Sequence, residues 1–197
     1  MFRIFKPDER ALQHLQARYR ELPLSDAEVG CTRGGGAAGH KVDNYRVQVG
    51  SGSVVFERAT QALRDWRMLR LGWVEPCWPN EPIKEGSLVG TLARVMGLWA
   101  VNVARIVYVI DEDGAVARFG FAYGTLPGHV EKGEERFLVE WDRNDGGVWY
   151  DILAFSRPRH ILARLGYPWV RRVQRRFGRE SAAALCRAVG DVAGRSA

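Results

Sequence analysis

The sequence predicts an α+β fold in which one antiparallel sheet packs against a long C-terminal helix. Residues 136–141 and 148–155 alternate bulky apolar with other side chains at period 2, which is typical of strands. Between them, residues 144–147 (NDGG) accept positive φ, so the two segments are expected to form a hairpin. Apolar side chains recur at helical spacing over 168–189, which predicts the helix.

The length and composition predict one domain. With 197 residues, of which 46% are hydrophobic, the chain is long enough for one buried core and does not require two. We expect this core to span about 42–189 of the single domain 1–197, with a helix at 8–22 and a glycine loop at 30–39 at its periphery.

The cysteines and the N-terminus favour a reducing, cytoplasmic location. Cys31, Cys77 and Cys186 are odd in number and far apart, which excludes a disulfide framework and a C-x-x-C metal site. The first residues lack the apolar core of a signal peptide, and the uncharged run 95–104 is too short to span a bilayer. We therefore expect a soluble protein without a transmembrane segment.

The first predicted element is an amphipathic helix over 8–22. Leu12, Leu15 and Tyr19 recur at helical spacing, and Pro23 ends the run. This helix is expected to cover a face or an edge of the sheet.

The glycine loop 30–39 formally contains the G-x-G-x-x-G pattern of dinucleotide-binding proteins. That motif requires a strand before it and a helix after it, whereas here a charged stretch precedes it and the alternating strand 42–50 follows. We interpret the loop as structural and expect no cofactor.

The next elements are a helix at 53–71, which Gly72 closes, and an aromatic segment containing Trp73 and Trp78. Tryptophan carries a large apolar area, so we expect this pair to pack a helix onto the sheet. The alternative is that the two rings border a binding cleft.

Three strands follow, at 87–96, 100–110 and 116–123, the last two joined by an Asp-Gly turn. On the middle strand Arg105 interrupts an apolar row. That row consists of Val101, Val103, Val107 and Val109. Arg105 either pairs with a carboxylate such as Glu131 or Glu135 inside a cavity, or lies at the rim with its stem buried, which is the commoner arrangement.

The strand 116–123 has one bulky face and one nearly bare face. Phe119, Phe121 and Tyr123 alternate with small residues, which are Gly120, Ala122 and Gly124. A bare face lets a helix or a ligand approach closely.

The connection 125–135 is the best candidate site in the sequence. It places His129 within a few residues of Glu131, Glu134 and Glu135. If these groups are buried, desolvation and mutual repulsion raise one carboxyl pKa and permit acid/base chemistry. The alternative is a solvated turn, because Asp and Glu side chains are mostly exposed.

The C-terminal part carries the positive charge of the chain. Residues 156–197 hold ten arginines against Glu180 and Asp191, and a short helical piece is expected before Gly166. On the long helix one predicted stripe is apolar, comprising Val170, Val173, Phe177, Ala184, Leu185 and Ala188. A second predicted stripe comprises Arg171, Arg172, Arg175, Arg176 and Arg179.

Four blocks carry a family resemblance: 72–76 (GWVEP), 123–140 (YGTLPGHVEKGEERFLVE), 148–160 (VWYDILAFSRPRH) and 167–177 (YPWVRRVQRRF). They closely resemble the domain of unknown function 1990 family, also called the UPF0548 proteins, over about 19–189. The family has no assigned reaction that the resemblance could imply.

The order of the elements is also similar to the helix-grip architecture of the Bet v 1 and START-like superfamily. This resemblance implies a curved sheet around the last helix and a cavity between them that holds hydrophobic ligands. Fold alone does not fix function.

Three hypotheses follow. The first is binding of a small, largely hydrophobic molecule between sheet and helix. Its candidate residues are Arg105, Phe121, Tyr123, Thr125, His129, Glu131, Glu135 and Tyr150. The second is a cyclase, hydratase or hydrolase using His129 with Glu131, Glu134 or Glu135; no nucleophile motif or metal-ligand spacing supports it.

The third hypothesis is binding of nucleic acid or an anionic surface by the arginines of 171–179. A solvated helix face is favoured over it, because no aromatic side chains for stacking are interleaved with these arginines.

Overall fold

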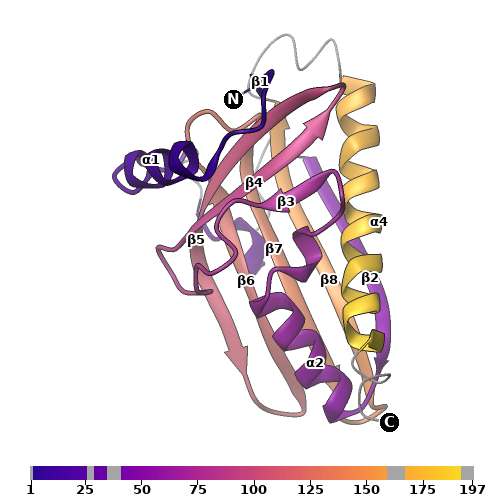
Figure 1. Ribbon diagram of the computed structural model, residues 1–197. Helices are drawn as coiled ribbons and strands as arrows, with labels where there is room; N and C mark the ends of the chain where they lie inside the picture. The colour runs from indigo at the N-terminus through magenta and orange to yellow at the C-terminus, as the bar shows by residue number, and fades with distance from the viewer. Residues whose placement is uncertain (1, 26–28, 35–40, 159–166, 192–197) are drawn as a thin grey trace.

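The protein is a half-barrel that wraps a helix. The computed structural model describes residues 2–25, 29–34, 41–158 and 167–191. An antiparallel sheet of eight strands curls around α4 (Tyr167–Asp191), which runs along its concave face (Figure 1). The predicted α+β, helix-grip architecture is confirmed. The short helical piece expected before Gly166 lies outside the described residues.

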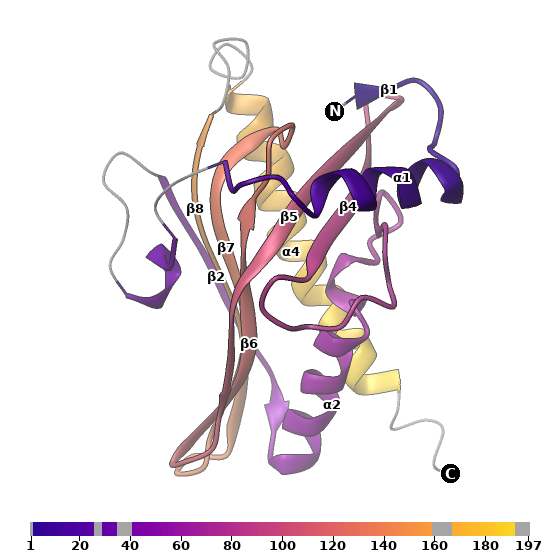
Figure 2. The same ribbon diagram turned by 90° about the vertical axis from the view of Figure 1, so that its left-hand side faces the viewer.

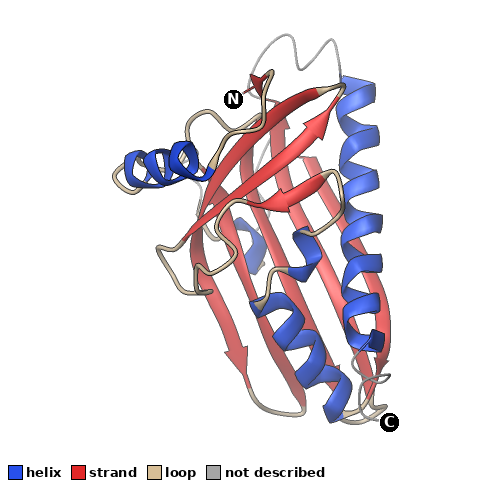
Figure 3. Ribbon diagram, viewed as in Figure 1, coloured by secondary structure: helices blue, strands red, loops and turns tan. Residues whose placement is uncertain are grey.

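The strands and helices alternate little along the chain, because six consecutive strands precede the last helix. Figure 3 shows the helices in blue and the strands in red. The strands are β1 (Phe2–Arg3), β2 (Lys41–Ser51), β3 (Val74–Pro76), β4 (Leu88–Val95), β5 (Leu98–Glu112), β6 (Val116–Thr125), β7 (Glu131–Asp142) and β8 (Gly147–Pro158). The helices besides α4 are α1 (Glu9–Tyr19) and α2 (Ser53–Arg64), and short 3-10 turns are η1 (Cys31–Arg33) and η2 (Arg67–Leu69).

The sheet order is β2-β8-β7-β6-β5-β4-β3, with β1 paired to β5. The predicted hairpin is β7–β8, and its register places Val139 opposite Tyr150 and Phe137 opposite Ile152. Because side chains alternate between faces, this register puts all four on the concave side.

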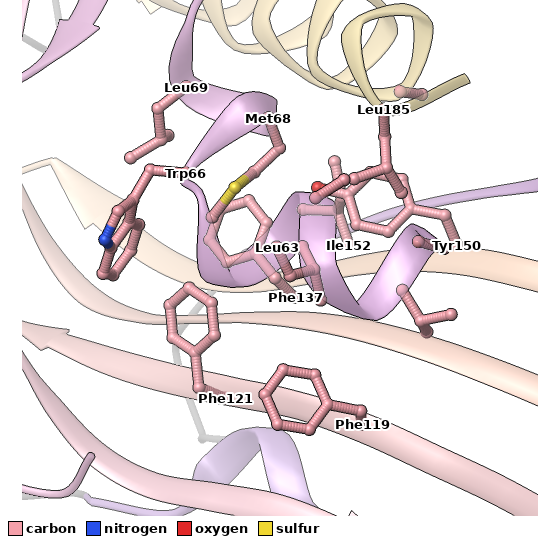
Figure 4. Packing of buried hydrophobic residues seen from close by; sticks show 14 of the residues in the cluster. Leu63, Trp66, Met68, Leu69, Phe119, Phe121, Phe137, Tyr150, Ile152 and Leu185 are labelled. Carbon is pink, nitrogen blue, oxygen red and sulfur yellow. The ribbon is translucent and has the colours of Figure 1, made fainter. Parts of the chain in front are cut away.

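The main core lies between the concave face and the two helices α2 and α4. Figure 4 shows Phe121 and Phe137 facing Leu63, Trp66 and Met68, with Leu185 of α4 above Tyr150. These side chains are at most 2% exposed. Phe121 and Phe137 stack with ring centroids 5.4 Å apart, and the Trp66 ring meets Phe121 edge-on at 5.3 Å. This half of the interface is filled by side chains.

The helix predicted over 53–71 ends at Arg64. Trp66 takes a left-handed conformation with φ of 55°, which turns the chain into η2. The turn lets the buried side chains of Trp66, Met68 and Leu69 all reach the core.

The convex face has its own covering. α1 contributes Leu12, Leu15 and Tyr19 to a second apolar cluster on β4 and β5. Figure 2 shows η1 on the opposite side of the sheet from α2 and α4. The expectation that the N-terminal helix covers a sheet face is therefore confirmed, and Trp78 packs there as well, its indole N–H donating to the Leu12 carbonyl at 3.3 Å.

The face assignment predicted for Arg105 and the valines of β5 is partly wrong. A bulge between Ile106 and Tyr108 shifts the alternation, so Val109 joins the concave core while Val101 and Val103 belong to the convex cluster. A bulge inserts one residue into one strand, so everything after it changes face.

The bare face of β6 does not face α4. It is the convex face; a Cβ on Gly124 would lie 3.1 Å from Leu24, so the chain after α1 covers it. At Gly120 a Cβ would lie 2.3 Å from the Phe137 carbonyl oxygen of β7. The small residues therefore allow close approach of protein backbone and side chains, and α4 lies on the bulky face instead.

Candidate functional site

The sheet and α4 meet in a second, polar set of contacts at the end away from α2. It lies near the start of α4 and the adjoining ends of β7, β8 and β2 (Figure 1). The set, called here the polar end, consists of Asp43, Tyr123, Glu131, Glu135, Ser156, Arg171 and Gln174.

Glu135 and Tyr123 form the innermost pair. They lie opposite each other on β7 and β6, both on the concave face, and the Tyr123 hydroxyl donates to Glu135 Oε2 in a short hydrogen bond. Burial raises the pKa of Glu135 to about 7; the Tyr123 bond opposes this rise, while the charges of Glu131 and Asp43 add to it. Burial, with the Glu135 charge, also raises the pKa of Tyr123 well above its ordinary value. Glu135 therefore exchanges its proton near neutral pH.

Glu131 is held by α4. Gln174 Nε2 donates to Glu131 Oε1 at 2.5 Å and approaches Ser156 Oγ at 3.4 Å. Burial raises the pKa of Glu131, against the Gln174 hydrogen bond, and the Asp43 charge raises it further. Glu131 and Glu135 lie on one strand an even number of positions apart, so both face the helix.

An ion pair ties this end of α4 to the edge strand. Both terminal nitrogens of Arg171 bond to the two carboxylate oxygens of Asp43 on β2, and Arg171 Nη1 also donates to Gln174 Oε1 at 2.8 Å. A bidentate arginine–carboxylate pair fixes geometry as well as charge. It orients Gln174 so that its amide nitrogen faces Glu131.

Aromatic rings separate the polar end from the filled core. The Phe177 ring of α4 meets Phe137 edge-on at 6.5 Å, and Phe137 lies 5.6 Å from the Tyr123 ring. A group contacting Glu135 would therefore have an apolar surface beside it.

Three of the predicted ligand-contacting residues are occupied by structural contacts. Phe121 is fully buried in the stack with Phe137. Tyr150 is also fully buried, and its hydroxyl shares a 3.1 Å hydrogen bond with Ser181 of α4. The Thr125 hydroxyl accepts from the Gly133 N–H at 3.2 Å.

Arg105 lies on the other side of the sheet. Its guanidinium donates to the carbonyls of Tyr19 and Arg20, at 3.0 and 2.7 Å, at the end of α1. The pairing of Arg105 with Glu131 or Glu135 is wrong. The Arg105 side chain lies on the convex face of β5, and its guanidinium binds the carbonyls at the C-terminal end of α1.

His129 is held within its own turn. Its Nδ1 accepts from the Glu131 backbone N–H at 3.1 Å, and its backbone N–H donates to the Leu126 carbonyl. The described contacts of His129 are therefore with residues of the same turn, whereas Glu131 and Glu135 lie near Tyr123.

Glu134 is on the convex face, because it alternates with Glu135. It is buried and accepts from the backbone N–H groups of Gly30 and Thr32, at 2.6 and 2.9 Å, and from the Thr32 hydroxyl. This contact, called here the η1 latch, holds the described part of the glycine loop on the sheet. The three carboxylates of the connection therefore do not form one cluster.

The predicted arginine stripe is divided among three surroundings. Arg171 pairs with Asp43, and Arg176 pairs with Glu180 at 2.7 Å and lies 4.5 Å over the Trp73 ring. Arg172, Arg175 and Arg179 are exposed. The five arginines therefore do not form one uniform surface, because α4 contacts β2 through Arg171 and Trp73 through Arg176.

Two further observations concern the class of site. Within the described part of the chain, no group of three or more His, Cys, Asp or Glu side chains is placed to hold a metal ion. Among the described helices, none combines the length and apolarity needed to cross a membrane.

Sequence reasoning missed Asp43, Arg171 as its partner, and Gln174. Alternation does place Asp43 on the same face as Tyr45 and Val47, and Gln174 interrupts the α4 stripe between Val173 and Phe177. A polar residue on an otherwise core-facing row was the available signal.

Comparison with known proteins agrees with this fold. Residues 25–184 match the family model described as Domain of unknown function (DUF1990). A UPF0548 protein of Dictyostelium discoideum is 42% identical over 158 residues, covering 76% of this chain and 73% of that protein. A UPF0548 protein of Deinococcus radiodurans is 37% identical over 204 residues, covering 96% and 100%.

Among solved structures, TTHA0849 from Thermus thermophilus is similar in fold, with a TM-score of 0.56 and 14% identity over 77% of this chain and 99% of that one. Weaker similarities, each with a TM-score of 0.46, are to Ara h 8.0201 (10% identity over 75% of this chain and 98% of that one) and human STARD10 (10% identity over 94% and 80%). The resemblance of the four sequence blocks to the DUF1990 family is confirmed, and the chain belongs to this family of UPF0548 proteins.

Proposed function

We propose that the protein binds a small, largely apolar molecule at the polar end, with Tyr123, Glu131 and Glu135 contacting the ligand's polar group. The observation that carries this proposal is the Glu135–Tyr123 pair. In this pair the Glu135 carboxyl group lies beneath α4, is partly accessible and titrates near neutral pH beside the Tyr123 and Phe137 rings. Few polar groups in an apolar setting are typical of small-molecule sites.

The charges at the polar end favour a ligand that donates hydrogen bonds, such as an amine or an alcohol. Among the described residues, the assigned ion pairs include none between a lysine or arginine and Glu131 or Glu135; Arg171 pairs with Asp43, and its charge partly offsets the rise in the pKa of Glu131. A buried carboxylate without a cation is unfavourable, and a donor on the ligand would relieve this. A carboxylate ligand would add to the repulsion.

The filled core limits where the ligand lies. Phe121, Phe137 and Tyr150 are fully buried, so the half of the interface near α2 has no room for it. Phe177, which is only partly buried and packs on Phe137, supplies the apolar contact at the boundary. The odd number and wide spacing of the three cysteines agree with the cytoplasm as the proposed location.

The test is native mass spectrometry of the protein purified from its own host. We expect a non-covalent adduct of one small molecule in the wild type and at least a tenfold smaller adduct fraction in Glu135→Gln combined with Tyr123→Phe. Glu57→Gln, an exposed change on α2, serves as the control and retains the adduct. A wild type without any adduct, or an adduct that survives the double substitution, would contradict the proposal.

A second candidate function is proton transfer to or from the bound molecule, and the pKa of Glu135 near 7 favours it. Glu135 would act as the acid or base, with Tyr123 holding its carboxyl in place. The mass and fragmentation pattern of the released molecule distinguish the two functions. Turnover predicts that Glu135→Gln retains a molecule that differs from that of the wild type, in mass if water is added or lost and in fragmentation pattern if the reaction is an isomerisation, whereas binding alone predicts the same molecule.

A further inference from the structure

A surface groove lies on the side of α4 that faces β3 and β4, away from the polar end. It is a half-open groove of about 180 Å³ between the first half of α4 and the end of the β4–β5 hairpin. Its apolar lining is Trp73, Val95, Met96 and Val173. An apolar cavity of about 150 Å³ accommodates a benzene-sized group, so the groove has room for a short apolar chain or one ring.

The hairpin turn holds an apolar side chain exposed at the edge of the groove. Met96 and Gly97 form the two-residue turn between β4 and β5, with φ values of 50° and 79°. Positive φ at both positions is the turn geometry that suits a tight hairpin. Met96 is 83% exposed, so its side chain is available for contact at the edge of the groove.

The polar lining of the groove is positive. It consists of Arg94, Arg172 and Arg176. Arg176 is neutralised by Glu180, which also accepts from the Trp73 indole N–H at 2.5 Å. Within the described residues, neither Arg94 nor Arg172 has a carboxylate partner, and both are exposed. Two guanidinium groups with no carboxylate partner in the described part of the chain therefore flank an apolar surface.

We infer that this groove binds a small amphipathic anion, with its carboxylate between Arg94 and Arg172 and its apolar part against Trp73 and Met96. Planar guanidinium groups bind carboxylates with paired hydrogen bonds. The charge preference is opposite to that proposed for the polar end, so the two sites would select different ligands.

The probe is sodium octanoate, added to ¹⁵N-labelled protein, with the Trp73 indole N–H signal as the readout. We expect saturable shifts of that signal with octanoate and at least tenfold weaker binding of octanamide, which has the same chain without the charge. The signal is assigned from a Trp73→Phe variant.

Arg94→Gln combined with Arg172→Gln is expected to weaken octanoate binding at least tenfold. Arg175→Gln is the matched control, because it removes an exposed α4 arginine outside the groove and should leave binding unchanged. Unchanged spectra elsewhere show that the variants are folded. Equal binding of octanamide, equal binding by the double variant, or no shift of Trp73 would overturn the inference. Binding only to phosphatidylglycerol vesicles would also overturn it, in favour of a membrane surface.

Discussion

The two ends of the sheet–helix interface differ in composition although the same sheet and the same helix form both. Near α2, α4 contributes Ala182, Leu185 and Val189 to a core of fully buried rings. Near its start, α4 contributes Arg171 and Gln174 to a network with carboxylates of β2 and β7. One end is built by apolar packing and the other by hydrogen bonds that keep titratable groups under the helix.

This difference indicates how the fold separates stability from binding. Packed apolar side chains stabilise the fold in proportion to the area they bury, and they leave no room for a ligand. A polar network beneath a helix stabilises less, because desolvation opposes its electrostatic gain. Substitutions at the two ends should therefore behave differently.

The largest effect is expected at the packed end. Leu185→Ala removes a fully buried side chain and should lower the free energy of unfolding by about 4 kcal/mol. Urea unfolding measures it, with Val54→Ala on α2 as a 56% exposed control that should change stability by less than about 0.5 kcal/mol. A loss for Leu185→Ala no larger than the control would show that this end is not tightly packed.

The pH dependence of stability should report Glu135. Its pKa is raised from 4.5 unfolded to about 7 folded, so the folded state keeps a proton that the unfolded state has released. This contribution is fully present below pH 4.5 and is lost as the pH rises through about 7, by up to about 3 kcal/mol at 1.36 kcal/mol per pKa unit.

Glu135→Gln removes this titration. The variant should therefore gain stability relative to the wild type between pH 4 and pH 8, as measured by urea unfolding at each pH. The same difference at both pH values would mean that Glu135 is not buried in a raised-pKa environment.

The neighbouring Glu134→Gln should act in the opposite direction at pH 8. It weakens an acceptor of the η1 latch that serves two backbone N–H groups and the Thr32 hydroxyl, so we expect a loss of about 2 kcal/mol. Ligand retention should be unaffected, because Glu134 faces away from α4. Loss of the adduct in Glu134→Gln with full stability would reverse the assignment of the two faces.

The smallest expected effect is that of Asp43→Asn, about 1 kcal/mol, because the pair with Arg171 is only half-buried. Its more informative consequence is on titration. Removing the Asp43 charge should lower the pKa of Glu135 and of Glu131, which that charge now raises. A carbon-13 carboxyl titration would measure both shifts, and unchanged values would place Asp43 outside the network.

The sequence predicted the strands well because alternation and turn residues are local. The hairpin β7–β8 and its turn followed from period-2 spacing, and the long helix from apolar spacing. The break after Arg64 was missed because it depends on a left-handed Trp66, whose conformation is stabilised by tertiary packing.

The candidate site was predicted in part. Tyr123, Glu131 and Glu135 were candidates from the sequence, and the structure brings them together. The shared face of the two carboxylates was not predicted, because the strand was expected to begin at 136 whereas β7 begins at Glu131. Of the two alternatives for Arg105, the less favoured pairing with Glu131 or Glu135 is wrong because a sheet has two faces that a sequence does not label, and Gln174 was missed because its partner is 43 residues away.

The most direct test of the account is the pKa of the Glu135 carboxyl itself, measured by carbon-13 NMR with Glu135→Gln identifying the signal. We expect a value of about 7, as for a carboxyl group buried under α4 beside Tyr123 and near the charges of Glu131 and Asp43. A value near the ordinary 4.5 would show that Glu135 is solvated, and the polar end would then offer no buried, titratable group to a ligand.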